Sequence, residues 1–222
     1  WGNLKRHADI QAMTSESRHH YVIAGLSVSS EIALPELISA SYEGGDADID
    51  IRLGPCPEHL EQAATSVPGA EIAENEVLLN FEDVARYHIR DGRQVTIEPA
   101  PAVRVRDVRL FVRGSGFGAL FFQRGLFPLH ASVIVINGQA IAFTGHSGAG
   151  KSTMAAWMSA RGYPLLCDDV CVIRFDDNYG AIAFPGVPLM KLWKDDLNAF
   201  EIDTRALTRY YFSAVKFHLE AE

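Results

Sequence analysis

The chain has 222 residues, of which 48% are apolar, and a formal net charge of −8, so it can form one large domain or two small ones around a buried core. This negative charge argues against nucleic acid as the main partner, because a phosphate backbone calls for a basic surface. No apolar run approaches the roughly 20 residues of a membrane span, and no apolar segment of a secretory signal follows the N-terminal WGNLKR.

The three cysteines, Cys56, Cys167 and Cys171, are odd in number and lack the paired spacing of a zinc site. We therefore expect a cytoplasmic protein in which Cys167 and Cys171 are reduced core thiols. The sequence starts at Trp1 rather than at a methionine, which indicates that further residues precede it.

The first 100 residues are expected to form a small, mostly β domain. Residues 1–20 are polar and rich in histidine, so we expect them to be frayed, including the pair His19 and His20, which has no metal-ligand partner nearby. Alternation and β-branched residues predict five strands, over 21–28, 47–53, 76–81, 85–90 and 94–99. Asp91-Gly92 joins the last two as a hairpin turn.

The segment Pro99-Ala100-Pro101 marks a break, after which residues 101–222 are assigned to a second domain. Apolar spacing predicts a helix over 107–122, although three glycines weaken it. The remaining expected elements are strands over 131–136 and 139–144 joined by Asn137-Gly138, a helix over 152–160, strands over 164–167, 170–175 and 181–184, and helical sequence from residue 194.

A complete phosphate-binding pattern, G-x-x-x-x-G-K-[ST], spans residues 145–152 between an expected buried strand and an expected helix. Its glycines allow backbone N–H groups to surround an anion, Lys151 would reach the β- and γ-phosphates, and Ser152 would ligate Mg²⁺. The predicted nucleotide contacts are Gly145, His146, Ser147, Gly148, Ala149, Gly150, Lys151, Ser152 and Thr153.

Asp168 and Asp169 directly follow an apolar strand, where acids point into the ligand crevice of α/β sheets. One carboxylate could hold Mg²⁺ while the other accepts the proton of an acceptor hydroxyl; the alternative is a solvated acidic turn. His130 precedes the strand over 131–136. It is either a capping or half-buried histidine or a donor close to the phosphate.

Other polar positions carry weaker signals. Lys191 could reach a phosphate, whereas Trp193 close by is expected to pack in the core. A basic cluster could contact an acidic substrate or a phosphate, but a solvated face is the favoured interpretation. This cluster consists of Arg104, Arg106, Arg109 and Arg113.

Three segments together resemble the catalytic domain of HPr kinase/phosphorylase. They are LHASV at 129–133, AFTGHSGAGKST at 142–153 and RGYPLLCDD at 161–169, so the resemblance covers roughly residues 125–175. It implies an α/β (α+β) protein with a P-loop domain of the phosphoenolpyruvate-carboxykinase type and ATP-dependent phosphorylation of a protein serine. Since HPr kinases form hexamers, it also raises the expectation of a homo-oligomer.

By this resemblance, His130, Lys151 and Asp168 are the expected catalytic residues, with Asp168 chosen as the base. Ser152 and Asp169 are the expected ligands of Mg²⁺, and ATP is the expected phosphate donor. His146 stands where many HPr kinases carry an acid, so altered phosphate contacts are expected there.

The departures from the HPr enzymes concern the later part of the chain. The E-x-R-G-x-G stretch does not follow Asp169, and FPGVP at 184–188, KLW at 191–193 and KFHL at 216–219 occur instead. This pattern resembles HPr-kinase-like proteins of lasso-peptide biosynthesis, which phosphorylate a C-terminal serine of a precursor peptide. We therefore expect a peptide acceptor and a C-terminal region that is incomplete in this sequence, and whether phosphorolysis occurs stays open. Two alternatives stay open, an ATP-binding regulator without kinase activity and a small-molecule kinase.

Overall fold

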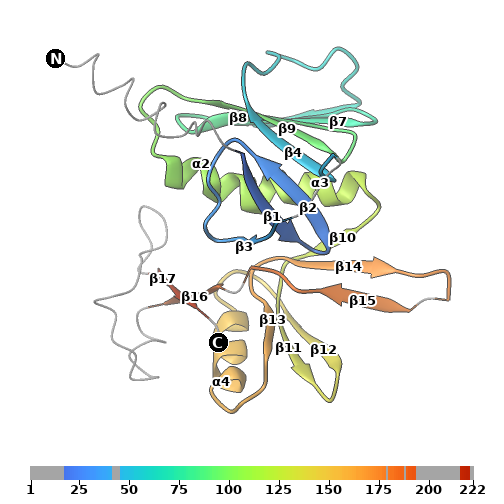
Figure 1. Cartoon of the computed structure of the whole chain (residues 1–222), viewed down its shortest axis with the longest axis vertical. Coiled ribbons are helices and arrows are strands. Elements are labelled where there is room, and N and C mark those ends of the chain that lie inside the picture. Colours follow the sequence, from blue (N-terminus) through green and yellow to red (C-terminus); the bar gives the residue numbers. More distant parts are fainter. Residues whose placement is uncertain (1–17, 42–45, 179, 188, 194–215, 221–222) are drawn as a thin grey trace. The chain divides into compact units, whose positions relative to one another are not determined.

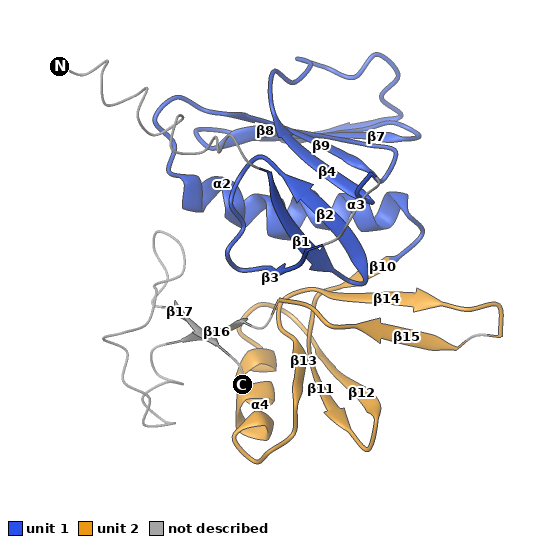
Figure 2. Ribbon diagram, viewed as in Figure 1, with its two compact units in different colours: residues 1–126 blue, residues 127–222 orange. Residues whose placement is uncertain are grey.

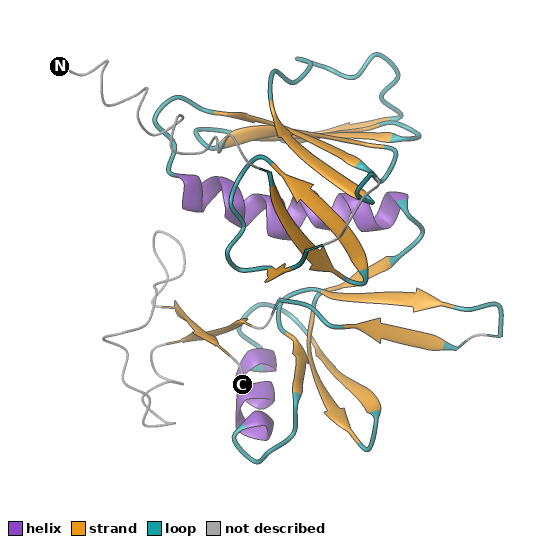
Figure 3. Cartoon of the chain, in the orientation of Figure 1, coloured by secondary structure: helices purple, strands orange, loops and turns teal. Residues whose placement is uncertain are grey.

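The computed structural model describes residues 18–41, 46–178, 180–187, 189–193 and 216–220 (Figure 1). The chain divides into two compact units, Trp1–Leu126 and Phe127–Glu222, here called unit 1 and unit 2 (Figure 2). Both combine strands with few helices (Figure 3), so the expectation of a mixed α and β protein is confirmed. In the part of the chain that the structure describes, no helix is both long and apolar enough to cross a membrane.

The described strands of unit 1 form one sheet in the order β3-β1-β2-β4-β9-β8-β7-β6-β5. The pairs β2·β4 and β4·β9 are parallel and the others antiparallel. The strands expected over 76–81, 85–90 and 94–99 are confirmed as β7 to β9, and the strand expected over 47–53 as β4. The bounds are β1 (His19–Ile23), β2 (Leu26–Ser30), β3 (Ile38–Ser39), β4 (Ile49–Leu53), β5 (Thr65–Val67), β6 (Ala70–Ile72), β7 (Glu76–Phe81), β8 (Ala85–Arg90) and β9 (Gln94–Pro99).

The single strand expected over 21–28 is wrong, because this segment is the hairpin β1–β2. Ala24 and Gly25 form its turn, with φ of 51° and 77°, the left-handed values that a two-residue hairpin turn of type I′ requires. The expectation of a frayed histidine pair is also wrong, since His19 and His20 begin β1 and lie opposite Ser30 and Ser29.

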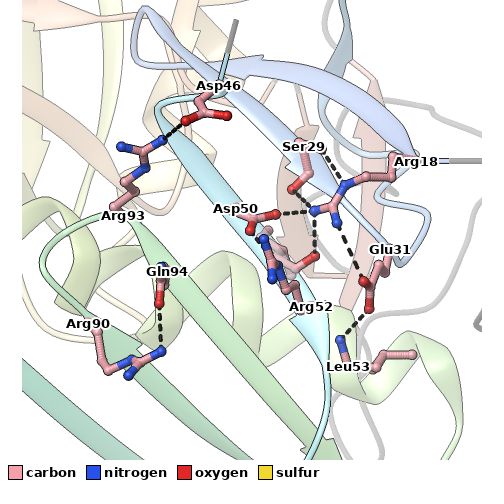
Figure 4. Close-up of polar contacts among 11 residues, drawn as sticks. Arg18, Ser29, Glu31, Asp46, Asp50, Arg52, Leu53, Arg90, Arg93 and Gln94 are labelled. Atoms are coloured by element: carbon pink, nitrogen blue, oxygen red, sulfur yellow. Dashed lines mark hydrogen bonds and ion pairs between the residues drawn. The ribbon is translucent and has the colours of Figure 1, made fainter.

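Arg18 fixes the start of β1 to the neighbouring strands (Figure 4). Its guanidinium donates to Ser29 Oγ at 2.6 Å and to Glu31 Oε1 at 3.4 Å, and it also bonds the carboxylate of Asp50 in β4. Arg52 donates to the second oxygen of Asp50 at 2.5 Å. These bonds tie the residue before β1 to β2, to the residue that follows β2, and to β4.

The helical segment after β9 belongs to unit 1, whereas the sequence placed the domain boundary at residues 100/101. It consists of α2 (Val105–Phe111), a π-helical turn η1 (Val112–Gly116) and α3 (Phe117–Gln123), in direct succession. The turn contains two of the three glycines that weakened the predicted helix. The apolar face of this helical segment packs on β8 through η1 and α3. This contact joins the segment to the sheet, and because it is not local in sequence, the Pro-Ala-Pro break does not reveal it. The fully buried members of the apolar face are Val108, Val112, Phe117, Leu120 and Phe121.

Tyr87 connects the sheet to these helices. Its ring is fully buried in β8, its hydroxyl donates to the Val108 carbonyl at 3.0 Å, and burial raises its pKa. We expect Tyr87→Phe to lower the free energy of unfolding of unit 1 by about 1 kcal/mol, because it removes one buried hydrogen bond while keeping the ring. Denaturant unfolding measures the change. The partly exposed Tyr163 of unit 2 provides the control Tyr163→Phe, and equal effects of the two variants would contradict the expectation.

Unit 2 has one α-helix among the residues described and three small sheets, in the orders β12-β11-β13, β10-β14-β15 and β16-β17. The hairpin at Asn137-Gly138 is confirmed, with φ of 52° and 77°. The predicted helical sequence from residue 194 lies outside the described residues up to 215, and residues 216–220 form a strand instead. The bounds are β10 (Phe127–Leu129), β11 (Ala131–Ile136), β12 (Gln139–Thr144), α4 (Lys151–Ser159), β13 (Leu165–Cys167), β14 (Cys171–Phe175), β15 (Ala181–Phe184), β16 (Leu189–Trp193) and β17 (Lys216–Glu220).

The strand before the phosphate-binding pattern was expected to be buried, and this is wrong. β12 is at the edge of its three-stranded sheet, and its side chains are exposed apart from Phe143, which is half-buried. The buried strand is β11, which lies between β12 and β13 and keeps Ala131, Val133 and Ile134 from solvent. Apolar content alone does not distinguish an edge strand from a central one.

Candidate functional site

The order of three strands gathers the candidate residues at one edge of unit 2. β12 and β13 both pair antiparallel with β11, so they run in the same direction and end beside the start of β11. The phosphate-binding pattern follows the end of β12, and the two aspartates follow the end of β13. His130 immediately precedes β11. The three motifs that the sequence analysis singled out therefore lie at the same end of one sheet.

The loop between β12 and α4 has the backbone that its glycines permit. Gly145, Gly148 and Gly150 have φ of 146°, 86° and 86°, values that residues with a side chain rarely adopt. A Cβ at Gly145 would also lie 3.2 Å from the Cβ of Ala149. The loop is exposed and ends at the N-terminus of α4, where free N–H groups and the helix dipole favour an anion.

Lys151 covers this loop with its own ammonium group. Its Nζ donates to the carbonyl oxygens of Gly145 at 2.8 Å and His146 at 3.1 Å. These acceptors are neutral, so a phosphate oxygen carrying negative charge would make a stronger bond to the same group. The positive charge of Lys151 therefore lies against the backbone of the first two residues of the loop.

Asp168 lies at the centre of the polar contacts. Its carboxylate is almost completely buried, and its Oδ1 accepts hydrogen bonds from Ser152 Oγ at 2.9 Å and from Ser132 Oγ at 2.5 Å. The sequence predicts Ser152 and Asp169 as the metal ligands, whereas in the structure Ser152 donates to Asp168.

Ser132 is a residue of this site that the sequence analysis did not identify. It lies in the quoted LHASV segment, but only His130 was singled out there. The period of two along a strand puts positions 130 and 132 on the same side, and this was the signal that could have found it. Its hydroxyl is completely buried and needs a polar partner, which the Asp168 carboxylate supplies.

Asp169 lies beside His130. Its φ is 81°, a left-handed conformation that aspartate tolerates better than most residues. His130 Nδ1 lies 2.6 Å from the backbone carbonyl oxygen of Asp169 and 3.6 Å from the side-chain Oδ1 of Asp169. Since a carbonyl oxygen only accepts, Nδ1 carries the hydrogen and Nε2 is the basic nitrogen when the ring is neutral. The ring is 57% exposed and the Asp169 side chain 32% exposed, so both reach solvent.

Two buried thiols flank the aspartates. Cys167 ends β13, Cys171 begins β14, and both pack with Ala131 and Val133 in the core of unit 2. Both are free thiols, as the sequence analysis expected. The neighbouring Cys171 thiol and burial raise the pKa of Cys167. This apolar packing holds the short turn that carries both aspartates.

The oxygens of Ser152 and Asp168 have the chemistry that Mg²⁺ prefers. The described residues include no group of three or more histidine, cysteine, aspartate or glutamate side chains placed to hold a metal. A cation here would therefore take its other ligands from phosphate oxygens and water, which is the usual arrangement for Mg²⁺ with a nucleotide.

Thr153, in the first turn of α4, is half-buried.

The basic cluster predicted from the sequence lies in unit 1, and three of its four arginines are paired with acids. Arg109 and Arg113 approach Glu36 Oε1 at 3.3 and 4.0 Å, and both arginines are largely buried. Arg104 donates to Asp107 at 2.9 Å. The interpretation of this cluster as a solvated face is therefore wrong for Arg109 and Arg113. Lys191 and Trp193 lie in β16, but their side chains are outside the description.

A scan of protein-family models finds no match to this chain, and searches of curated proteins and of solved structures give no significant match either.

Proposed function

We propose that unit 2 binds Mg·ATP and transfers its γ-phosphoryl group to a serine hydroxyl of a peptide. One observation carries the proposal, namely that the phosphate-binding loop, the aspartate pair and His130 lie at the same end of the β12-β11-β13 sheet. A glycine-rich loop alone supports only phosphate binding. Transfer to a hydroxyl also requires a group that holds the metal and a base that accepts the hydroxyl proton. The Asp168 carboxylate, which is hydrogen-bonded to Ser152, and the Asp169 carboxylate beside His130 can supply these two groups.

In this proposal the loop N–H groups and Lys151 hold the phosphates. Ser152 and Asp168 hold Mg²⁺, which when bound neutralises charge on the phosphate oxygens. This reverses our sequence-based assignment of Asp168 as the base and Asp169 as the metal ligand. The reason is that Ser152 donates to Asp168, while the Asp169 side chain is more exposed and lies by His130.

The transfer itself is an in-line displacement. The serine oxygen forms a bond to the γ-phosphorus while the bond from that phosphorus to the bridging oxygen of ADP breaks. The serine proton passes to the Asp169 carboxylate, and His130 Nδ1–H, bound to the Asp169 carbonyl, fixes the turn that presents this carboxylate. Most of the rate then comes from positioning and charge stabilisation.

The acceptor class rests on the resemblance to HPr-kinase-like proteins of lasso-peptide biosynthesis. We propose an extended peptide with a serine at or near its C-terminus, rather than HPr itself.

The test is incubation of the protein with Mg²⁺ and γ-labelled ATP in the presence of peptides that end in serine. We expect label on the peptide and a mass gain of one phosphoryl group at the serine, and the same peptides ending in alanine serve as controls. ATP binding without label transfer would support a regulator and reject the kinase proposal. Label on a small hydroxyl compound but not on any peptide would reject the peptide acceptor.

A further inference from the structure

We propose that Ser132 is a positioning residue that holds the Asp168 carboxylate in place and thereby sets the affinity of the loop for Mg²⁺. The inference rests on the proposed function, since it assigns a role in binding the metal that accompanies ATP. Nothing in the phosphate-binding pattern itself includes position 132.

The hydroxyl of Ser132 lies in an apolar core. Ser132 is completely buried in β11 between Ala131 and Val133, which are also buried. A hydroxyl in an apolar core costs free energy unless it is hydrogen-bonded. Ser132 donates to Asp168 Oδ1, and a bond to an ionised acceptor is stronger than a neutral one. A small apolar side chain such as alanine would fill this core position without a polar group, so the serine points to a role beyond packing.

The pairing of β11 with β13 places Ser132 beside Asp168. Val133 in β11 lies opposite Cys167 in β13, so Ser132 and Asp168 are each one residue beyond this pair. The pairing of β11 with β13 therefore places the Ser132 hydroxyl opposite the Asp168 carboxylate. Ser152 reaches the same oxygen from α4. One carboxylate oxygen thus links β11, the end of β13 and the first turn of the helix.

The two bonds to Asp168 differ in what nucleotide binding does to them. Ser152 belongs to the loop and has to serve the cation as well as the carboxylate. Ser132 is away from the loop in sequence, and its bond depends only on the sheet. Ser132 can therefore keep the carboxylate oriented while Ser152 engages Mg²⁺. Partners of this kind, which orient metal ligands, typically change metal affinity or activity by about 10- to 100-fold when they are removed.

The experiment compares ATP affinity with Mg²⁺ and with EDTA by calorimetry, for the whole chain and its variants. For Ser132→Ala we expect the gain in affinity from Mg²⁺ to fall about 10- to 100-fold, while the dissociation constant in EDTA stays within about twofold of wild type. Ser30→Ala is the matched control, because Ser30 is equally buried in unit 1 and bonds the Ile32 carbonyl. It should keep the wild-type gain from Mg²⁺.

Four results would overturn the inference. One is a wild-type Mg²⁺ gain in folded Ser132→Ala; another is an equal loss of affinity with Mg²⁺ and with EDTA, which a purely structural role predicts. Should Ser132→Ala not fold, Ser132→Cys tests the same point, because its thiol has similar size but donates weakly, and a full Mg²⁺ gain there rejects the inference. If the wild type and Ser30→Ala bind no ATP, the proposed function fails and this inference fails with it.

Discussion

Replacing Lys151 by alanine is expected to lower the rate of γ-phosphate transfer by about 10²- to 10³-fold, the loss typical of removing one preorganised charge donor from a transition state. Lys151 is the cation over the loop, and its described bonds go to the carbonyl oxygens of Gly145 and His146. Since these bonds are at an exposed site, the variant should keep the stability of the wild type. Single-turnover transfer of labelled phosphate to the peptide measures the effect.

Arg161→Ala is the matched control for this loss of charge. Arg161 follows α4, and its guanidinium lies 3.5 Å above the ring of Trp157, which is partly exposed. Removing it changes the net charge by the same amount as Lys151→Ala but leaves the loop intact, so transfer should stay near the wild-type rate. Wild-type turnover in Lys151→Ala would reject the site altogether. An equal loss in both variants would mean that net charge, and not the position of Lys151, is responsible.

The sequence predicted the local elements of the site well because their signals are local. Alternation and the Asn137-Gly138 turn define the β11–β12 hairpin, and the spacing of glycines before Lys151 defines the loop and the start of α4. The order of the three strands was not predictable in this way. Pairing of β11 with β13 depends on contacts between segments about 30 residues apart, and no residue pattern encodes them.

The period of two in a strand does not predict which of the two aspartates contacts Ser152. A period of two predicts opposite directions for neighbouring side chains in a strand, and Asp168 and Asp169 do have different environments. However, β13 ends at Cys167, and the left-handed backbone of Asp169 lies in the following turn. Which acid meets Ser152 was therefore set by the turn and by the buried Ser132, and the sequence assignment chose the other acid.

The limits of the fold prediction have similar causes. Turn residues at 24–25 were hidden within an apolar run, so a hairpin was taken for one strand. The exposure of β12 follows from its place at the edge of its sheet, which composition does not report. The helical segment joins unit 1 through the contacts of η1 and α3 with β8, whereas proline marks only a change of local backbone direction.

Asparagine at each aspartate should give two different defects, and this is the second large effect we expect. Asp168→Asn should raise the Mg²⁺ concentration needed for half-maximal transfer by at least about tenfold, because it removes a charged oxygen from the proposed ligand set. Asp169→Asn should lower the maximal rate by about 10²- to 10⁴-fold, the usual contribution of a general base, without changing the Mg²⁺ requirement. Steady-state transfer at varied Mg²⁺ separates the two.

The comparison also decides between the two assignments of the base. An asparagine cannot take the serine proton, so the variant of the true base should lose rate at saturating Mg²⁺ and ATP while it still binds both. If Asp168→Asn shows this pattern and Asp169→Asn shows the raised Mg²⁺ requirement, the assignment made from sequence is right and the one made from the Ser152 contact is wrong. Asp177→Asn, in an exposed turn of unit 2, should change neither quantity. The hydrogen bonds of Ser152 and Ser132 to Asp168 favour Asp168 as the metal ligand, because a carboxylate held by two hydroxyls is oriented to bind a cation and less able to approach an acceptor.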